Sequence, residues 1–236
     1  NGFISMLETG VKNSMTVKLD GLIMRTINNM TGQILNSANG LQKVNLLTEY
    51  NTASGQTLTA NKALMDKDFL KFASLTIKKY QARITKMSTL FNAGGKARFT
   101  TTDNLHTVLL SDFADSAEVY LLSDTYHNDT VSLPNHETVP YWQGSGKSYA
   151  FNDISKIDVK IDAGNKQPKQ VTQTGILGVM FDTNALGVSN LNQRTTTSYN
   201  ARAEFYTNYY KMDAGYFNDL NENFVVFYIA DVTPGK

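Results

Sequence analysis

The sequence predicts an α+β fold, because two long helical patterns come first and mostly strand-like runs follow. The first pattern covers about the first 35 residues, and the second extends over about residues 60–92. After residue 95 the apolar residues fall in short runs rich in β-branched and aromatic side chains, which are typical of strands. The chain has no internal repeat and no low-complexity tract.

Apolar residues recur at steps of four along the first predicted helix. They are Phe3, Leu7, Val11, Met15, Leu19, Ile23 and Ile27, and Met30 and Ile34 continue the series. A step of four overshoots the helical repeat by about 40° each time, so the apolar stripe winds slowly around the helix. Such a helix is expected to contact different neighbours at different heights.

Three glycines lie eleven residues apart in the same segment, at Gly10, Gly21 and Gly32. This spacing places them on nearly one face of the helix. Each costs up to about 1 kcal/mol relative to alanine inside a helix. They are either tolerated glycines or a bare face against which another backbone packs closely.

The remaining segments are expected to alternate between strands and short connections. Residues 37–40 should end the first helix, residues 41–50 read as a short strand or extended connection, and Gly94 and Gly95 should stop the second helix. A short helix is expected over residues 113–122, and a loop over residues 123–148. The expected strands are 97–100, 106–110, 154–161, 174–181, 202–210 and 224–230, with a turn over 164–169.

Composition excludes several classes of protein. The 236 residues carry 22 basic and 21 acidic side chains, a net charge of +1, whereas a protein that depends on phosphate contacts usually has a basic excess. Without cysteine the chain can form no disulfide framework, thiolate zinc site or cysteine nucleophile. No apolar run reaches the roughly 18 residues that a membrane span needs, so no membrane partner is expected.

The segment Gly144-Ser145-Gly146-Lys147-Ser148 resembles the end of a phosphate-binding loop. The full pattern needs a glycine five residues before Gly146, and that position holds Tyr141. Neither a buried strand before the segment nor a helix after it is expected. A surface loop is therefore the preferred interpretation, and no nucleotide cofactor is predicted.

Five potential metal ligands fall within fourteen residues, at Asp124, His127, Asp129, His136 and Glu137. Their spacing does not match the helical geometry of known zinc signatures, so a polar loop is preferred over a metal site. No G-x-S-x-G nucleophile elbow occurs, and His106 reads as a half-buried strand residue. We predict no catalytic, cofactor-binding or metal-binding residues, and no enzyme activity.

Aromatic residues concentrate near the C-terminal end of the chain. They are Phe205, Tyr206, Tyr209, Tyr210, Tyr216, Phe217, Phe224, Phe227 and Tyr228. A stacking surface for single-stranded nucleic acid is one interpretation. The acidic residues Glu204, Asp213, Asp219 and Glu222 lie among them, so an aromatic sheet face or a protein interface is preferred.

The order of several segments resembles the major capsid protein of tailed bacteriophages, with its Hong Kong 97-like fold. After two long helices come Arg98-Phe99-Thr100-Thr101-Thr102-Asp103-Asn104-Leu105-His106, Val108-Leu109-Leu110-Ser111-Asp112-Phe113, Ser155-Lys156-Ile157, Gly175-Ile176-Leu177-Gly178-Val179-Met180-Phe181-Asp182, Thr197-Ser198-Tyr199-Asn200 and Asn223-Phe224-Val225-Val226-Phe227. The resemblance covers about residues 3–230. It lies in the order of the segments, because no single motif is diagnostic.

The resemblance implies a long spine helix packed on the sheet of a peripheral domain, and an axial domain of mixed sheet and helices. Residues 1–43 would form the peripheral domain with the spine helix, residues 44–187 the axial domain, and residues 188–236 a long strand pair that returns to the peripheral domain. Within this scheme the 202 and 224 strands are expected to pair with each other, against the first helix.

The function implied by the resemblance is structural. The subunit would self-assemble, as pentamers and hexamers, into the icosahedral head shell around a double-stranded DNA genome. Scaffolding, portal or decoration proteins would be further partners, DNA would be touched only nonspecifically, and assembly would take place in the host bacterial cytoplasm before the subunit becomes part of the virion. A non-viral protein nanocompartment of the same fold is the alternative.

Members of this family carry an N-terminal arm and an extended loop before the spine helix, and the sequence shows neither. The first residue is Asn1 rather than methionine. We therefore expect the chain to be the core of a longer subunit.

Overall fold

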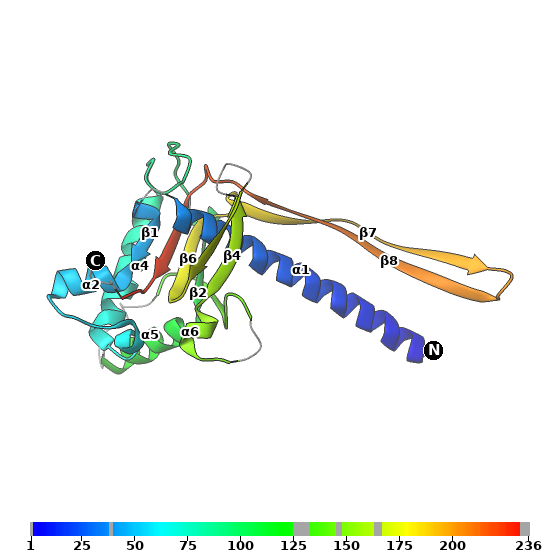
Figure 1. Ribbon diagram of the computed structural model, residues 1–236, viewed down its shortest axis with the longest axis horizontal. Coiled ribbons are helices and arrows are strands. Elements are labelled where there is room, and N and C mark those ends of the chain that lie inside the picture. Colours follow the sequence, from blue (N-terminus) through cyan, green and yellow to red (C-terminus); the bar gives the residue numbers. More distant parts are fainter. Residues whose placement is uncertain (1, 38–39, 125–132, 145–147, 163–166, 232–236) are drawn as a thin grey trace. The chain divides into compact units, whose positions relative to one another are not determined.

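The computed structural model describes residues 2–37, 40–124, 133–144, 148–162 and 167–231 (Figure 1). The helices are α1 (Gly2–Asn36), α2 (Leu46–Ser54), α3 (Ala60–Ala63), α4 (Lys67–Ile84), α5 (Ser111–Asp124) and α6 (Phe151–Ile154). The strands are β1 (Lys43–Asn45), β2 (Leu105–Leu110), β3 (Glu137–Val139), β4 (Ile157–Asp162), β5 (Pro168–Gln173), β6 (Ile176–Asp182), β7 (Leu186–Asn200), β8 (Phe205–Asn218) and β9 (Phe224–Tyr228). The predicted α+β class is confirmed.

The chain divides into two compact units, which are described separately. Unit 1 contains residues 1–27 and 186–218, and unit 2 contains residues 28–185 and 219–236. The long helix α1 contributes its first part to unit 1 and its last turns to unit 2. In the part of the chain that the structure describes, no helix is long and apolar enough to cross a membrane.

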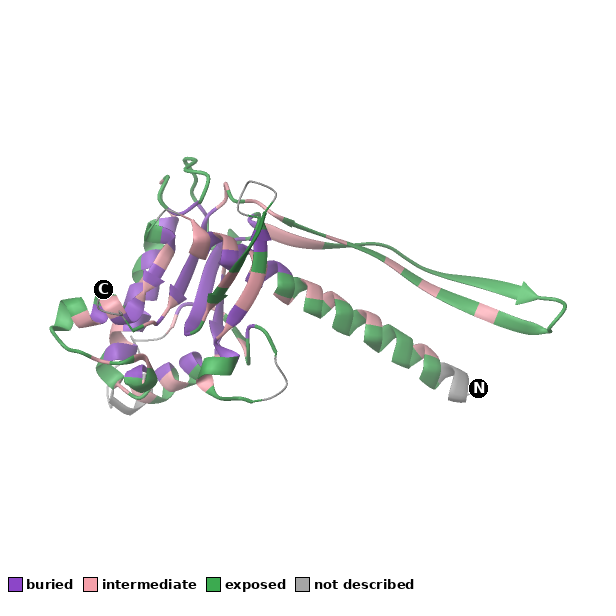
Figure 2. Ribbon diagram, in the orientation of Figure 1, coloured by how far each residue is buried: buried purple, intermediate pink, exposed green. Residues whose placement is uncertain are grey.

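A five-stranded sheet forms the centre of unit 2, in the order β1-β9-β6-β2-β3. Strand β9 lies antiparallel to β6 and parallel to β1. Every residue of β6 is buried, as are the first four of β9, which explains why both read as unbroken apolar runs (Figure 2). The strands predicted at 106–110, 174–181 and 224–230 are confirmed to within two residues at each end.

Aromatic side chains join the helices of unit 2 to its sheet. The Tyr80 ring of α4 meets the Phe227 ring edge-on, with centroids 5.5 Å apart. The Phe69 ring, nearer the start of the same helix, meets Tyr50 of α2 at 5.6 Å. These contacts pack α4 against both the sheet and α2, and the three elements form one core.

The last turns of α1 also pack in unit 2. Met30 and Ile34 are fully buried. A Cβ atom at Gly32 would lie 2.4 Å from a methyl group of Val159 in β4. At Gly32, therefore, the absence of a side chain makes room for side chains of β4, whereas one of the two interpretations of the glycine series predicted close packing of another backbone.

The second long helix is shorter than predicted. The chain breaks at residues 64–66, where the Asp66 side chain accepts a hydrogen bond from the backbone N–H of Phe69 (2.8 Å) and starts α4 afresh. The helix ends at Ile84 rather than at residue 92. Phe91 belongs instead to a loop, where its carbonyl accepts a hydrogen bond from the Phe224 N–H (2.9 Å).

Residues 41–50 were also assigned wrongly from the sequence. Only Lys43–Asn45 is a strand, and α2 follows at once. The Asn45 side chain caps this helix by accepting from the N–H of Thr48, and Gly55 ends it with φ at +69°, a value that glycine adopts without strain. The apolar residues of 46–50 therefore face the core from a helix.

Smaller differences concern the connections. Residues 97–100 form no strand, and only a backbone bridge joins Arg98 to Ser88. Ile154 lies in the short helix α6, while β4 begins at Ile157. The turn expected over residues 164–169 lies partly outside the described residues, and β5 begins at Pro168 and pairs with β4 along its whole length.

The expected pairing of the 202 and 224 strands is wrong. Strand β8 pairs with β7 in a hairpin of unit 1, whereas β9 pairs with β6 and β1 in unit 2. The hairpin arises because β7 and β8 are close in the chain and join through a short turn. The Asn200 side chain stabilises this turn by accepting hydrogen bonds from the N–H groups of Arg202 and Ala203.

Candidate assembly surfaces

The hairpin of unit 1 consists of two long strands with no buried residue. Its register extends from Leu186 opposite Asn218 to Asn200 opposite Phe205. All residues of both strands are exposed or intermediate (Figure 2). A two-stranded hairpin alone is at best marginally stable in water, so strands of this length need another surface to pack on.

Both faces of the hairpin carry large aromatic side chains. Residues directly opposite each other share a face, so Tyr199 and Tyr206 lie together, with ring centroids 4.7 Å apart. Phe205 and Tyr209 lie on the opposite face, because successive residues of a strand alternate. Polar residues such as Thr197 and Ser198 lie between these rings, so each face combines exposed aromatic side chains with the polar side chains usual on a solvent face.

A bulge divides the hairpin into two parts. Leu191 pairs with Asp213 and Arg194 with Lys211, so Asn192 and Gln193 together oppose a single residue. Asn192 has φ at +54°, a left-handed conformation that asparagine tolerates better than most residues. An ion pair lies next to the bulge, between Arg194 Nη1 and Asp213 Oδ2 at 3.6 Å.

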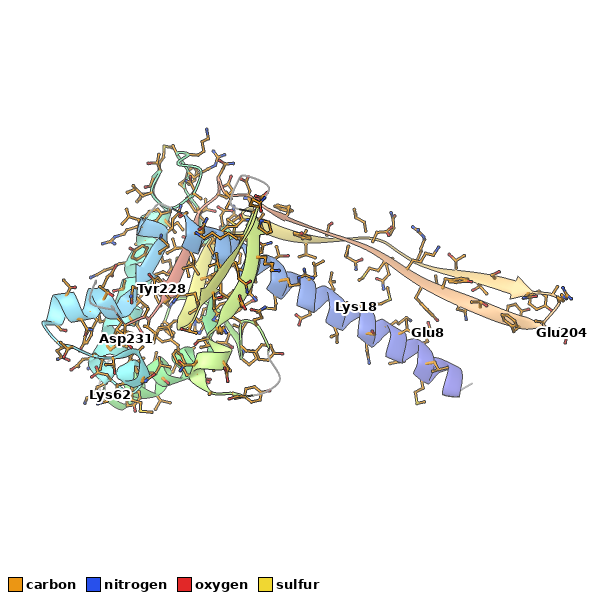
Figure 3. All side chains as sticks on the ribbon, in the orientation of Figure 1. Glu8, Lys18, Lys62, Glu204, Tyr228 and Asp231 are labelled. Carbon is orange, nitrogen blue, oxygen red and sulfur yellow. The ribbon has the colours of Figure 1, made fainter. Side chains whose placement is uncertain are left out.

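Helix α1 also exposes apolar side chains along its unit 1 part. Two residues of the predicted apolar stripe are exposed there, Leu7 and Ile23. Met6, beside the stripe, and Val17, outside it, are exposed as well. Gly21 and Gly10 have no atom within 4 Å of a Cβ position, in contrast to Gly32. Among the described residues of unit 1, only Thr26 and Ile27 are buried. Figure 3 labels Glu8 and Lys18 on this helix and Glu204 in the hairpin turn.

The aromatic cluster predicted near the C-terminal end divides between the two units. Phe224 and Phe227 are fully buried in the sheet of unit 2, where they form core contacts. The aromatic residues between 205 and 217 belong to the hairpin, and most of them are exposed. The cluster is therefore not one continuous surface, and its exposed part is a property of the hairpin.

The phosphate-loop-like segment lies only partly within the described residues. Gly144 sits in the connection between β3 and α6, where the Tyr141 ring lies against it, while residues 145–147 are outside the described part. The strand before it, β3, has three residues and none is buried, as expected. The expectation that no helix follows is wrong, because the four-residue helix α6 begins at Phe151.

The five potential metal ligands cannot be assessed as a group, since His127 and Asp129, as well as the Asp124 side chain, are not described. The other two point to different partners. His136 Nδ1 lies 2.7 Å from the carbonyl of Pro134, and Glu137 Oε2 lies 3.3 Å from Nε2 of His106. Within the described ranges, no group of three histidine or carboxylate side chains converges.

Sequence reasoning missed β7 as a strand and the exposure of the hairpin. The Thr195–Thr197 run is a β-branched signal that could have identified β7. The bulge at residues 192–193 interrupts the alternation of the strand and obscures this signal. The exposure follows from tertiary structure, because the same aromatic residues would suit a buried face equally well.

A family model described as the Phi29-like phage major capsid protein matches residues 1–228. The chain belongs to this family. The predicted resemblance is thereby confirmed, and so is the structural capsid role that it implied. Major capsid proteins of phages are structural components of the virion.

A comparison with solved structures supports the fold of this capsid protein. The chain aligns with a structure described as the capsid of Staphylococcus phage Andhra, with a TM-score of 0.51 and 12% sequence identity. The alignment covers 97% of this chain but 65% of that chain. The likeness is one of fold and agrees with the Hong Kong 97-like architecture. No curated protein matches this capsid protein in sequence.

Proposed function

We propose that the chain self-assembles, as pentamers and hexamers, into an icosahedral head shell around double-stranded DNA, and that unit 1 provides its main contacts between copies. Its role would be purely structural, without catalysis. Assembly would take place in the host bacterial cytoplasm, with scaffolding, portal or decoration proteins as further partners and only nonspecific contact with DNA.

The single observation that carries this proposal is the exposed hairpin. Six exposed aromatic residues lie on its two strands: Tyr199, Phe205, Tyr206, Tyr209, Tyr216 and Phe217. If neighbouring copies covered half of each ring, about 500 Å² of apolar surface would leave water, which corresponds to a gross gain on the order of 10 kcal/mol. Association costs of similar size would reduce this gain, which suits a reversible contact repeated many times.

The domain assignment remains a proposal within this scheme. Residues 1–43 and 188–236 would form the peripheral domain, and residues 44–187 the axial domain. The grouping of the hairpin with the first part of α1 in one compact unit supports a peripheral domain built from both. The family match favours a phage shell over a non-viral nanocompartment of the same fold.

The proposal can be tested with the full-length gene product and a variant that removes aromatic surface from both hairpin faces. Tyr199→Ser, Tyr206→Ser and Tyr209→Ser in one chain should abolish shells in electron micrographs. The free energy of unfolding of unit 2 should stay within about 0.5 kcal/mol, because these side chains lie outside its core. Ser189→Ala on the same hairpin is the matched control and should assemble normally.

Two outcomes would contradict the proposal. The first is a full-length wild-type protein that stays monomeric in every condition tested. The second is normal shell formation by the triple variant, which would show that the exposed aromatic faces of the hairpin do not contribute to assembly.

A further inference from the structure

Unit 2 contains a cleft that the contacts described so far do not use. It has a volume of about 490 Å³ and lies between α3, α5 and α6. Its apolar part is formed by Leu64, Met65 and Phe151, and the Met65 side chain is 76% exposed. Asp112 and Asp115 line its other side from the first turns of α5. The cleft therefore combines an apolar surface with two carboxylates.

The charge on this side of α5 is entirely negative. Residues 111–119 contain three acidic side chains and no basic one, and Asp112, Asp115 and Glu118 are all exposed. None of the three forms an ion pair with another described residue. Partial burial of its carboxyl, and then the nearby negative charge of Asp115, raise the pKa of Asp112. Lys62 lies on the neighbouring α3 (Figure 3). It is not among the residues that line the cleft.

A loop with complementary properties lies at the other end of α4. Residues 85–99 form neither helix nor strand, yet hydrogen bonds hold them in place. The Asn92 side chain accepts from the N–H of Lys96 (2.7 Å) and donates to its carbonyl (2.6 Å). The backbones of Ser88 and Arg98 bond in both directions, and the Gly94 N–H donates to the carbonyl of Leu220 (2.9 Å). These hydrogen bonds give the loop a defined conformation on the surface of unit 2.

This loop presents apolar and basic side chains outward. Met87, Leu90 and Phe99 are exposed, Met87 at 72%. Lys86 and Lys96 are exposed beside them, and the segment contains three basic residues and no acidic one. Among the described residues, Arg98 is the basic residue of this loop that forms an ion pair, with Glu222 Oε1 at 3.0 Å. The positive charges of Lys86 and Lys96 are therefore available to a surface that carries negative charge.

The loop cannot reach the cleft of its own chain. Helix α3 lines the cleft, and three residues separate it from the start of α4. The loop begins directly after the end of α4. Its 18 residues span about 27 Å at 1.5 Å per residue. A contact between the two surfaces must therefore join two copies.

We propose that loop 85–99 of one copy docks in the cleft between α3, α5 and α6 of a second copy. Met87 and Phe99 would cover the apolar part of the cleft, and Lys86 and Lys96 would lie near Asp112 and Asp115. The two surfaces differ, so each copy offers one loop and one cleft, and such a contact extends from copy to copy as a ring or a chain. The proposal rests on the self-assembly proposed above and adds the contact made by unit 2.

Two charge-reversed variants of the full-length protein test this contact. Lys86→Glu/Lys96→Glu reverses the loop, and Asp112→Lys/Asp115→Lys reverses the cleft. Each alone places like charges against each other and should reduce the yield of shells by at least tenfold. In a mixture of the two variants, the reversed loop of the first can meet the reversed cleft of the second. The native loop of the second can meet the native cleft of the first, so assembly should return. Lys79→Glu/Lys160→Glu is the control for the loop variant, because it makes the same change in net charge, and it should assemble like wild type.

The results separate this contact from the proposed function. Restored assembly in the mixture supports the docking, because it requires loop and cleft to meet between copies. Normal shells from either variant alone would overturn the docking proposal and leave the proposed hairpin contacts intact. A mixture of the two folded variants that forms no shells would do the same. Circular dichroism confirms folding, and Asp112→Asn/Asp115→Asn replaces the cleft variant if lysines in the first turn unfold α5. This neutral variant should reduce assembly less than the reversal does. A wild-type protein that never assembles would reject both proposals.

Discussion

The two units of this capsid protein differ in how their apolar residues are used. Unit 2 buries them in a five-stranded sheet covered by helices, and many of its side chains are fully buried. Unit 1 has comparable aromatic residues on its hairpin, but none of the hairpin residues is buried. The difference shows that similar residue types form a core in one unit and stay exposed on the surface in the other. Four predictions, given from the largest expected effect to the smallest, test this comparison.

The largest effect is expected from Phe227→Ala. Phe227 is fully buried in β9 and meets the Tyr80 ring at 5.5 Å, so its loss leaves a cavity in the core of unit 2. The free energy of unfolding should fall by about 3–5 kcal/mol in urea denaturation. Tyr216→Ala, on the exposed hairpin, should change it by less than about 0.5 kcal/mol. Equal losses would refute the distinction between the two units.

Thr100→Val should have the second largest effect. The buried Thr100 hydroxyl donates to Asp182 Oδ2 (2.8 Å) and accepts from Asn223 Nδ2 (3.1 Å), and so links a loop to the ends of β6 and β9. Valine would leave both groups without this partner, at a cost of about 1–3 kcal/mol. Thermal unfolding should show the loss, whereas Thr101→Val, at an exposed neighbour, should leave Tm nearly unchanged.

Gly32→Ala and Gly21→Ala should change stability in opposite directions. An added Cβ at Gly32 would clash with Val159 at 2.4 Å, so this variant should be destabilised. At Gly21 the space is open, and alanine should stabilise the helix by up to about 1 kcal/mol. Chemical denaturation of both variants measures this difference. A destabilised Gly21→Ala subunit would show that a hidden contact exists there.

The smallest effect is expected from Glu49→Gln. Burial raises the pKa of the Glu49 carboxyl, and the nearby charges of Arg83 and Lys79 only partly oppose this rise. Because the folded-state pKa of Glu49 lies above the unfolded value, the protonated carboxyl favours the folded state at low pH. This contribution of Glu49 to stability is lost as pH rises through the raised pKa. Glutamine removes this loss, so the variant should gain less than about 1 kcal/mol relative to wild type between pH 4 and pH 7. A relative loss over this range would contradict the sign.

The sequence predicted those elements whose residues show a strong local pattern. Helix α1 and strand β9 are examples, since a long periodic segment and an unbroken apolar run each have one simple interpretation. Helix α2 was missed because its identity depends on the Asn45 cap rather than on periodicity. The partner of β8 was wrong because strand pairing depends on contacts between segments, which local patterns do not contain.

The candidate surfaces show the same limit. The aromatic residues of the hairpin could be identified from the sequence, but their exposure could not, because tyrosine and phenylalanine suit a core and an interface equally well. The cleft of unit 2 was not predicted at all. Asp112 and Phe151 lie in different segments of the chain, and only the packing of α5 near α6 brings them to one cleft.

The bulge at Asn192 and Gln193 has a consequence for the uniformity of the subunits. A slip of one residue between β7 and β8 would turn every side chain of one strand to the opposite face. A ribbon with aromatic residues on both faces would oppose such a slip only weakly. The bulge places a left-handed residue at one position, and asparagine accepts this conformation more readily than the threonines nearby. The bulge therefore fixes the register of β7 against β8, so every copy of the hairpin has the same pattern of rings on each face.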